Sequence, residues 1–424
     1  MIVDRPVTIA VIGTMDTKGA EHDFVCEVIR RNGGRPLVID CGVLGAPRDI
    51  AVDVTREEVA EAAGSTLADV RGYGERGPAI ETMLRGLRAI LSGHTGCAFD
   101  GVIALGGAEG TVMGTAAMQV VPLGVPKLMV SAIASGPRTF GPFVGVSDIT
   151  ITHSVVDVAG FNQIARSVYA NAAAGIVAMA REHRDHPPEA DGPSVGISML
   201  GNTQPAVDHL IPRLAERGFA ALAFHANGVG GCALERLAHE GAVDVVVELA
   251  VNEVTNELIG GATRSTEPGR METASAAGVP TVFVPACADF VTFGPIEDVP
   301  ERFRGRPMYR HNPHFTLVRA DAAQMRRFGA EFARRLNGAT GPLVVIWPEL
   351  GLSLMDRDGG EFEDPAADAA FLEALRHDLT VDHSLIRVAA HVNDTAVADA
   401  IAEAVDNVAG AFATTHHPTI GGRL

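Results

Sequence analysis

The sequence has few cysteines and no long apolar run. Its five cysteines, Cys26, Cys41, Cys97, Cys232 and Cys287, include no CxxC pair. A small, odd number of separated cysteines argues against a disulfide framework and a structural zinc site, and fits a reducing compartment. No run approaches the roughly 18 apolar residues of a membrane helix, and the first apolar segment is too short for a signal peptide. We therefore expect a cytoplasmic protein that does not insert into membranes.

An excess of basic charge is also absent. The chain has 34 Lys and Arg against 52 Asp and Glu, a net charge of −18. Such a field repels a polyphosphate backbone, which argues against nucleic acid as a partner. HExxH does not occur, and the one GxSxG match, at 192–196, leads into a strand instead of following one. The one GxGxxG match, at 72–77, follows a polar segment and lacks the context of a dinucleotide fingerprint.

What the sequence does contain is a regular alternation of apolar strands and amphipathic helices. With 424 residues, 47% of them hydrophobic, the chain predicts two domains. We expect an α/β fold of two Rossmann-like, doubly wound domains with mostly parallel sheets, at 1–183 and 194–424. A polar, Pro-rich linker at 182–193 separates them. The predicted strands are 7–12, 35–40, 101–105, 127–132, 148–152, 194–200, 220–224, 243–249, 281–285, 343–347 and 386–390. The stretch 290–314 predicts a long, irregular functional loop.

The first turn after a predicted strand carries polar groups suited to an anion. Its glycine, hydroxyls, carboxylate and ammonium lie at a helix N-terminus, where amides and the helix dipole favour negative charge. The residues predicted to contact a phosphate here are Gly13, Thr14, Asp16, Thr17 and Lys18. The alternative is a turn that only caps the helix, with Asp16 as its N-cap.

A second turn, after strand 101–105, is rich in glycine. Glycines let backbone amides curl around phosphate oxygens, and a threonine adds a hydroxyl donor. The predicted contacts are Gly106, Gly107, Glu109, Gly110 and Thr111. Because a carboxylate is awkward beside an anion, we expect Glu109, or Asp16 in the first turn, to hold Mg²⁺. Tight packing of the turn is the alternative.

Two further residues follow strands of the same sheet. Asp40 ends the second strand, where dinucleotide folds place an acid on the ribose hydroxyls, and Ser135 lies in the loop after the fourth. The alternatives are a turn residue that bonds its own backbone and an ordinary crossover loop.

The second domain is predicted to bind a substrate or partner. The turn after strand 220–224 repeats the order of strand, glycine cluster and helix, and 264–272 carries two arginines suited to carboxylate or phosphate. The predicted substrate contacts are His225, Gly228, Gly230, Arg270 and Glu272. His311 joins Asp16 and Glu109 as a catalytic candidate, and a Cys287–His311 nucleophilic pair is conceivable. A packing turn and a surface Arg270–Glu272 ion pair are the alternatives.

Several of these segments together resemble a known family. The segments 11–18 (VIGTMDTK), 38–42 (VIDCG), 104–111 (ALGGAEGT), 225–231, 268–274 (PGRMETA), 286–294 (ACADFVTFG), 309–313 (YRHNP) and 356–365 carry the resemblance. On them the chain is similar to the Tm-one-like ATP-binding domain family over nearly its whole length. The resemblance implies two Rossmann-like subdomains, ATP binding, and self-association into a homodimer or larger homo-oligomer.

Residues and resemblance together lead to one hypothesis and two alternatives. We expect an ATP-binding protein, an ATP-dependent enzyme that acts on a small carboxylate or phosphorylated metabolite between the domains. The two glycine turns would hold the phosphates, Asp40 the ribose, and Arg270, His225 and His311 would face the substrate. One alternative is a nucleotide-responsive protein-binding module without turnover. The other is an NAD-type oxidoreductase, suggested by the fold alone.

Overall fold

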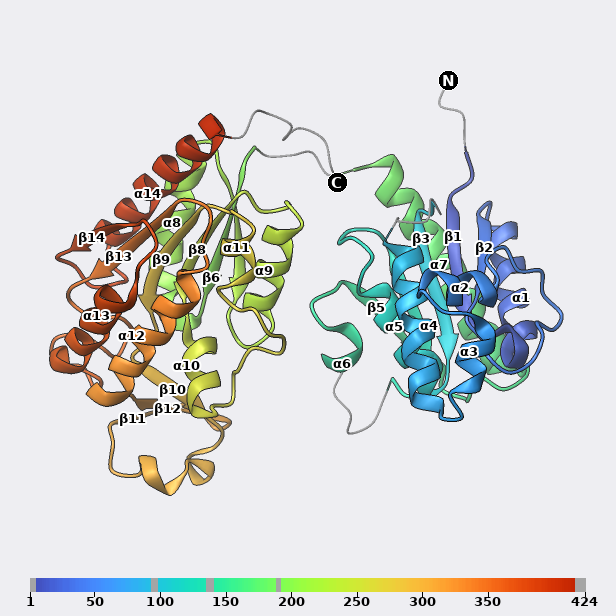
Figure 1. Ribbon diagram of the computed structural model, residues 1–424, viewed down its shortest axis with the longest axis horizontal. Coiled ribbons are helices and arrows are strands. Elements are labelled where there is room, and N and C mark those ends of the chain that lie inside the picture. The colour runs from blue at the N-terminus through green and yellow to red at the C-terminus, as the bar shows by residue number, and fades with distance from the viewer. Residues whose placement is uncertain (1–4, 93–97, 135–140, 188–191, 416–424) are drawn as a thin grey trace. The chain divides into compact units, whose positions relative to one another are not determined.

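The computed structural model describes residues 5–92, 98–134, 141–187 and 192–415. The chain divides into two compact units, Met1–Pro188 and Glu189–Leu424, and each contains one wholly parallel sheet (Figure 1). The α/β architecture predicted from the alternation of strands and helices is therefore confirmed. In the described part of the chain, no helix is both long and apolar enough to span a bilayer.

The sheet of the first unit has five parallel strands in the order β2-β1-β3-β4-β5. Their bounds are β1 (Thr8–Gly13), β2 (Arg35–Asp40), β3 (Gly101–Gly106), β4 (Lys127–Ser131) and β5 (Ile149–His153). Each lies within one residue of its predicted bounds. Strands β1, β3 and β4 are buried along their whole length, as expected for central strands that helices cover on both faces.

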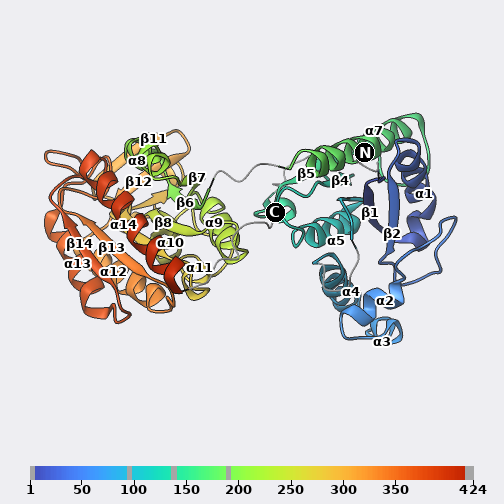
Figure 2. The same cartoon turned by 90° about the horizontal axis from the view of Figure 1, so that it is seen from above.

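Helices form a layer on each face of this sheet (Figure 2). Helices α1 and α7 pack on one face through Val25, Ile29 and Tyr169, and α2, α4 and α5 pack on the other through Met83 and Ala117. The helices are α1 (Met15–Arg31), α2 (Arg56–Ala62), α3 (Leu67–Gly72), α4 (Arg76–Leu91), α5 (Ala108–Met118), α6 (Gly141–Val144) and α7 (Gln163–Asp185).

The second unit repeats the strand order of the first and adds one strand at its edge. Its parallel sheet runs β7-β6-β8-β9-β13-β14, so the first strand again lies between the second and the third. The strands are β6 (Ser194–Met199), β7 (Ala220–His225), β8 (Val245–Ala250), β9 (Thr281–Ala286), β13 (Leu343–Pro348) and β14 (Ser384–Val388). Each lies within two residues of its predicted bounds.

Two helix layers also cover this larger sheet. Helices α8 and α14 share one core with alternate residues of the strands, such as Val195 and Ile346, and α12 and α13 share the other with Phe283 and Trp347. The helices are α8 (Gln204–Glu216), α9 (Gly230–His239), α10 (Asn252–Ile259), α11 (Thr273–Ala276), α12 (Ala322–Leu336), α13 (Pro365–Asp378) and α14 (Thr395–Thr415).

The stretch predicted as one irregular loop contains regular structure. Strands β10 (Phe290–Phe293), β11 (Met308–Asn312) and β12 (Phe315–Arg319) form an antiparallel sheet in the order β10-β12-β11. The prediction of an irregular segment at 290–314 is therefore wrong for β10 and β11, and β12 follows directly after that stretch. The outer strand β11 is polar and mostly exposed, so it lacks the alternation by which a half-buried strand is recognised.

A buried charge cluster joins the elements of the second unit. The guanidinium of Arg270 is fully buried and donates to Glu253 (2.6 Å), to Glu248 (2.7 Å) and to Glu235 (3.3 Å). Each oxygen of these carboxylates accepts at least one hydrogen bond, the remaining donors being Ser198 and backbone amides. Burial and the neighbouring Glu248 raise the pKa of Glu235 to about 7. We call these four residues the Arg270 cluster.

Replacement of Arg270 should destabilise the second unit strongly. Arg270→Met leaves three buried carboxylates without their counter-charge, and we expect the free energy of unfolding to fall by at least about 3 kcal/mol. Arg334→Met is the matched control, because Arg334 is 58% exposed in its ion pairs with Glu272 and Glu331; it should cost less than about 1 kcal/mol. Trp347 is the one tryptophan of the sequence, so denaturant unfolding followed by its fluorescence reports on this unit. Equal losses in both variants would contradict the assignment.

Candidate functional site

The strand order of the first unit places its two glycine turns side by side. Strand β1 pairs with β2 on one side and with β3 on the other, and α1 and α5 leave for opposite faces of the sheet. In an open parallel sheet, ligands bind in the crevice where the chain switches direction, outside the carboxyl ends of the strands. Here that crevice lies between the turns that follow Gly13 and Gly106.

The turn after β3 is tight at its first glycine and open at its second. A Cβ on Gly106 would lie 2.5 Å from the Cα of Gly110, whereas a Cβ on Gly107 would meet only Asp157 Oδ1, at 3.6 Å. Gly107 is the N-cap of α5 and has no side chain to cap the helix. Thr111 Oγ1 donates to the carbonyl of Gly107 (2.8 Å), so this hydroxyl holds the turn in place.

The turn after β1 presents hydroxyls and one unpaired ammonium. Thr14 is the N-cap of α1 but makes no capping bond, and its hydroxyl lies 2.9 Å from that of Thr17. Lys18 is half-buried at a kink in the helix, with φ −129° and ψ 21°, and has no ion-pair partner among the described residues. Gly13 is required because a Cβ there would overlap the ring of His22.

Asp40, predicted to bind the ribose, is used inside the protein. Its side chain is buried; Oδ1 accepts from the amides of Met15 (3.0 Å) and Gly42 (2.9 Å), and Oδ2 accepts from Arg56 Nε (2.8 Å) and Nη2. A carboxylate has about four acceptor positions, so none is left for a ligand. Asp40 fixes the start of α1 and orients Arg56, a residue that no sequence motif pointed to.

Asp16, predicted to hold Mg²⁺ or to act in catalysis, also binds the backbone. Its Oδ2 accepts from the amides of Gly45 (2.9 Å) and Leu44 (3.2 Å), with Arg56 Nη1 at 3.9 Å. These contacts tie the loop 41–47 to α1. Beside this loop lies a pocket of about 500 Å³, lined by Asp40, Arg56 and Arg71 among others. We call it the β2 pocket.

The other predicted residues of the first unit lie at the surface or outside the described part. Glu109 is exposed in the first turn of α5 and pairs with Arg76. Asp157, which the sequence analysis missed, approaches the same turn from the loop after β5. Ser135 lies outside the described residues.

In the second unit, the predicted anion-binding turn holds one of the protein's own carboxylates. Glu253 Oε1 accepts from the amides of Gly228 (2.7 Å) and Gly231 (3.4 Å), and Oε2 accepts from Arg270. A Cβ on Gly230 would overlap the carbonyl of His225, which explains this glycine by packing. Arg270 is therefore occupied within the Arg270 cluster, and its side chain is fully buried.

The remaining candidates of the second unit do not converge. His225 is exposed at the end of β7, His311 is exposed on β11, and Glu272 pairs with Arg334 at 2.9 Å. Cys287 is fully buried, with φ +60°, and burial raises the pKa of its thiol far above the usual value. A thiol in this setting is a poor nucleophile, so the Cys287–His311 pair finds no support.

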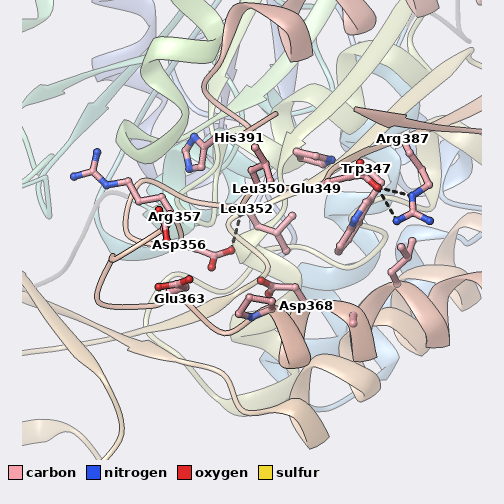
Figure 3. A pocket seen from close by; sticks show the side chains of 16 residues that line it. Trp347, Glu349, Leu350, Leu352, Asp356, Arg357, Glu363, Asp368, Arg387 and His391 are labelled. Atoms are coloured by element: carbon pink, nitrogen blue, oxygen red, sulfur yellow. Dashed lines mark hydrogen bonds and ion pairs between the residues drawn. The ribbon is translucent and has the colours of Figure 1, made fainter. Parts of the chain in front are cut away.

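The second unit has a larger pocket that the sequence analysis did not find. It has a volume of about 790 Å³ and lies at the carboxyl ends of β13 and β14. Its walls combine apolar side chains, such as Trp347 and Leu372, with charged ones (Figure 3). The charged lining residues are Glu349, Asp356, Arg357, Asp358, Glu363, Asp368 and Arg387, and His391 adds an imidazole. We call it the β13 pocket.

A buried group of charges underlies the β13 pocket. Arg319 donates to Asp368 Oδ1 (2.7 Å) and lies 4.0 Å from Asp356 Oδ1; Ser353 donates to Asp289 Oδ2 (2.7 Å). Burial, reinforced by Asp356, raises the pKa of Asp289 to about 7, and burial raises that of Asp368 to about 8. Asp289 Oδ1 is buried without a hydrogen-bond partner. We call Arg319, Asp289, Asp356 and Asp368 the Arg319 cluster.

The fold and its pockets define the class of protein: two doubly wound α/β units of the same strand order, with polar groups at the carboxyl edges of parallel sheets. The chain belongs to the UPF0261 family, since residues 7–185 match the family's N-terminal domain and residues 192–409 its C-terminal domain, both described as uncharacterised. This confirms the relationship expected from the sequence segments.

Relatives occur in bacteria and in a plant. A UPF0261 protein of Rhizobium meliloti is 38% identical over 405 residues, which are 95% of this chain and 99% of the relative. One from Clostridium tetani is 35% identical over 94% of this chain and 98% of its own length. The ToMV resistance protein Tm-1 of Solanum lycopersicum is 31% identical over 92% of this chain, which corresponds to 54% of the tomato protein.

The two glycines after β3 should respond differently to a methyl group. Gly106→Ala forces the new Cβ against the backbone of Gly110, and we expect a loss of about 1–3 kcal/mol in the free energy of unfolding. Gly107→Ala meets no atom closer than 3.6 Å and should change stability by less than about 0.5 kcal/mol. Scanning calorimetry of both variants tests this. A Gly107→Ala variant as unstable as Gly106→Ala would show that the space above Gly107 is closed.

The raised pKa values of the Arg319 cluster predict that the free energy of unfolding falls as the pH rises from about 4 to about 8. Asp368 keeps its proton up to about pH 8 in the folded chain, but loses it near pH 4 when unfolded. The folded state therefore binds more protons between these values, and this stability is lost as the pH rises through the folded pKa. Between about pH 5.5 and 8.5, the free energy of unfolding should fall by about 1–2 kcal/mol less in Asp368→Asn than in wild type. Denaturant unfolding followed by Trp347 fluorescence measures this, and the control Asp378→Asn, at a half-exposed residue, should keep the wild-type dependence.

Proposed function

We propose that this chain binds ATP at the carboxyl edge of its first sheet, with the phosphates in the crevice between β1 and β3. The observation that carries the proposal is the open start of α5 at Gly107, beside the switch point of the sheet. A ligand phosphate there would accept hydrogen bonds from the first amides of α5 and would face the positive end of its dipole. Lys18 would add a counter-charge from the neighbouring turn.

The capping of the helices supports this placement. Helices α2, α3 and α7 begin with side-chain caps, from Thr55, Thr66 and Asn162. Helices α1, α4 and α5 have no cap from their own N-cap residues Thr14, Glu75 and Gly107, but at α1 the Met15 amide donates to Asp40. Of the helices that begin at the switch point, α5 is therefore the one without a side-chain acceptor among the described residues. The first amides of a helix need acceptors from outside it. A bound phosphate would provide them at the start of α5, where no side chain of the described residues does so.

The β2 pocket would receive the nucleoside. It lies at the carboxyl end of the strand next to β1, and its volume of about 500 Å³ falls in the range of small-molecule sites. Arg56, held by Asp40, and Arg71 line it. In this proposal Asp40 contributes by orienting Arg56, because its own oxygens are already hydrogen-bonded.

Two carboxylates near Gly107 suit a metal ion that accompanies the phosphates. Mg²⁺ bound with a nucleotide commonly takes one or two carboxylates in addition to phosphate oxygens. Glu109 on α5 and Asp157 after β5 both lie at this turn. We propose them as the Mg²⁺ ligands, in place of Asp16, whose Oδ2 binds the loop amides.

Titration calorimetry of the full chain tests ATP binding. We expect a dissociation constant of about 100 µM or lower with Mg²⁺ present. Lys18→Met should weaken binding about tenfold through loss of a charge-assisted contact. Gly107→Val should abolish binding because its side chain would occupy the phosphate position. Gly77→Val, at an exposed glycine in the first turn of α4 with no atom within 4 Å of its Cβ, is the control and should bind normally.

Two outcomes would end the proposal. One is the absence of heat at about 1 mM ATP with and without Mg²⁺. The other is an equal effect of the Gly107 and Gly77 variants. Phosphate release by the ATP-bound protein then separates an ATP-dependent enzyme from a nucleotide-responsive binding module, since only the enzyme would turn ATP over.

A further inference from the structure

We propose that the β13 pocket of the second unit is a separate binding site for a small organic amine, with Asp356 and Asp368 as counter-charges for its ammonium group. The pocket lies at the carboxyl edge of a parallel sheet, where doubly wound folds bind ligands, and has the volume of a small-molecule site. The pocket is formed within the second unit alone and is distinct from the proposed ATP site.

The Arg319 cluster has more carboxyl groups than guanidinium groups. Its three carboxylates surround a single guanidinium. Asp356 Oδ1 and Asp368 Oδ2 accept no hydrogen bond from any residue that the structure describes, and both residues line the pocket. Asp289 Oδ1, which does not line the pocket, is also buried and unpartnered. An ammonium group in the pocket would take the place of the proton that burial keeps on Asp368 up to about pH 8, and would donate hydrogen bonds to the unused oxygens of Asp356 and Asp368.

The Arg270 cluster provides an internal comparison. It has the same composition, one guanidinium and three carboxylates, but all six carboxylate oxygens accept hydrogen bonds. It lines neither pocket described here, so it is explained by structure alone. The Arg319 cluster differs in the two respects that a binding site requires: it has unused acceptors, and two of its carboxylates border a cavity.

The rest of the pocket fits an organic cation. In Figure 3 the side chains of Asp356, Glu363 and Asp368 point into the same part of the pocket, while Arg357 points away from them and Arg387 is paired with Glu349. Trp347, Leu350, Leu352 and Leu372 provide apolar walls for a carbon skeleton, and an aromatic ring also attracts cations. This charge is opposite to that of the carboxylate or phosphorylated substrate expected from the sequence.

A metal ion fits these residues less well. No group of three or more His, Cys, Asp or Glu side chains within the described ranges is placed to hold one. His391 is also committed, because its Nδ1 accepts from the amide of Asn393 (3.2 Å) and its Nε2 donates to the carbonyl of Ser353 (2.8 Å). The carboxylates of the pocket are therefore better placed to surround an ammonium group than to coordinate a metal ion.

The test is titration calorimetry of the full chain with tyramine, agmatine and spermidine, supported by Trp347 fluorescence. At least one amine should bind with a dissociation constant of about 1 mM or lower. Tyrosol, which matches tyramine but has a hydroxyl in place of the amine, should bind at least about tenfold more weakly. The absence of binding by all three amines at about 10 mM would overturn the proposal, as would equal binding of tyramine and tyrosol.

Variants distinguish the pocket from other acidic surfaces. Asp368→Asn should weaken the amine at least about tenfold. Glu363→Gln changes an exposed lining residue, so it leaves the fold intact and should weaken binding about two- to fivefold. Asp378→Asn removes a half-exposed charge at the other end of the same helix, α13, and should bind as wild type. Equal weakening by Asp378→Asn and Asp368→Asn would show non-specific attraction to an acidic protein and would overturn the assignment.

Discussion

The structure depends on the requirement that neighbouring strands of both large sheets run in the same direction. Parallel neighbours cannot be joined by a tight hairpin, so each strand is followed by a crossing segment, in most cases helical, and the carboxyl ends of all strands meet at one edge. Both units place their first strand between the second and the third. This order creates one switch point per sheet, and polar residues that are distant in the sequence are brought to the same edge.

The two units provide different acceptors for the backbone amides at the carboxyl edges of their sheets. Every helix that begins there directs unpaired amides and a positive dipole end toward the space above the sheet. In the second unit, Glu253 accepts from the glycine turn after β7 and is neutralised by Arg270, so the chain provides its own anion. In the first unit, Asp40 accepts from the Met15 amide at the start of α1, but no side chain of the described residues caps α5. Similar glycine turns thus bind a carboxylate of the protein itself in the second unit and have no such side-chain acceptor after β3 in the first.

Much of the fold could be predicted from the sequence, but less of the site. The buried strands β1 and β3 are recognisable because helices cover both of their faces, which demands continuous apolar runs. The polar edge strand β11 carries no such pattern. Gly107 was identifiable as an open turn from its local sequence, whereas Asp40 was not identifiable as a partner of Arg56, 16 residues away. The β13 pocket was missed because it combines Trp347, Asp368 and His391, which only the packing of β13, β14 and α13 brings together.

The charge of each edge is set by side chains and not by the fold. Helix dipoles contribute positive potential above both sheets, because helices begin at the carboxyl edge in each. In the first unit Lys18 and the uncapped amides add to that potential. At the β13 pocket the carboxylates outnumber the guanidiniums and reverse it. Burying carboxylates with unused acceptors costs stability that the saturated Arg270 cluster does not lose. These buried carboxylates destabilise the free chain, but they would stabilise a complex with a bound cation. Functional sites often reduce the stability of the free protein in this way.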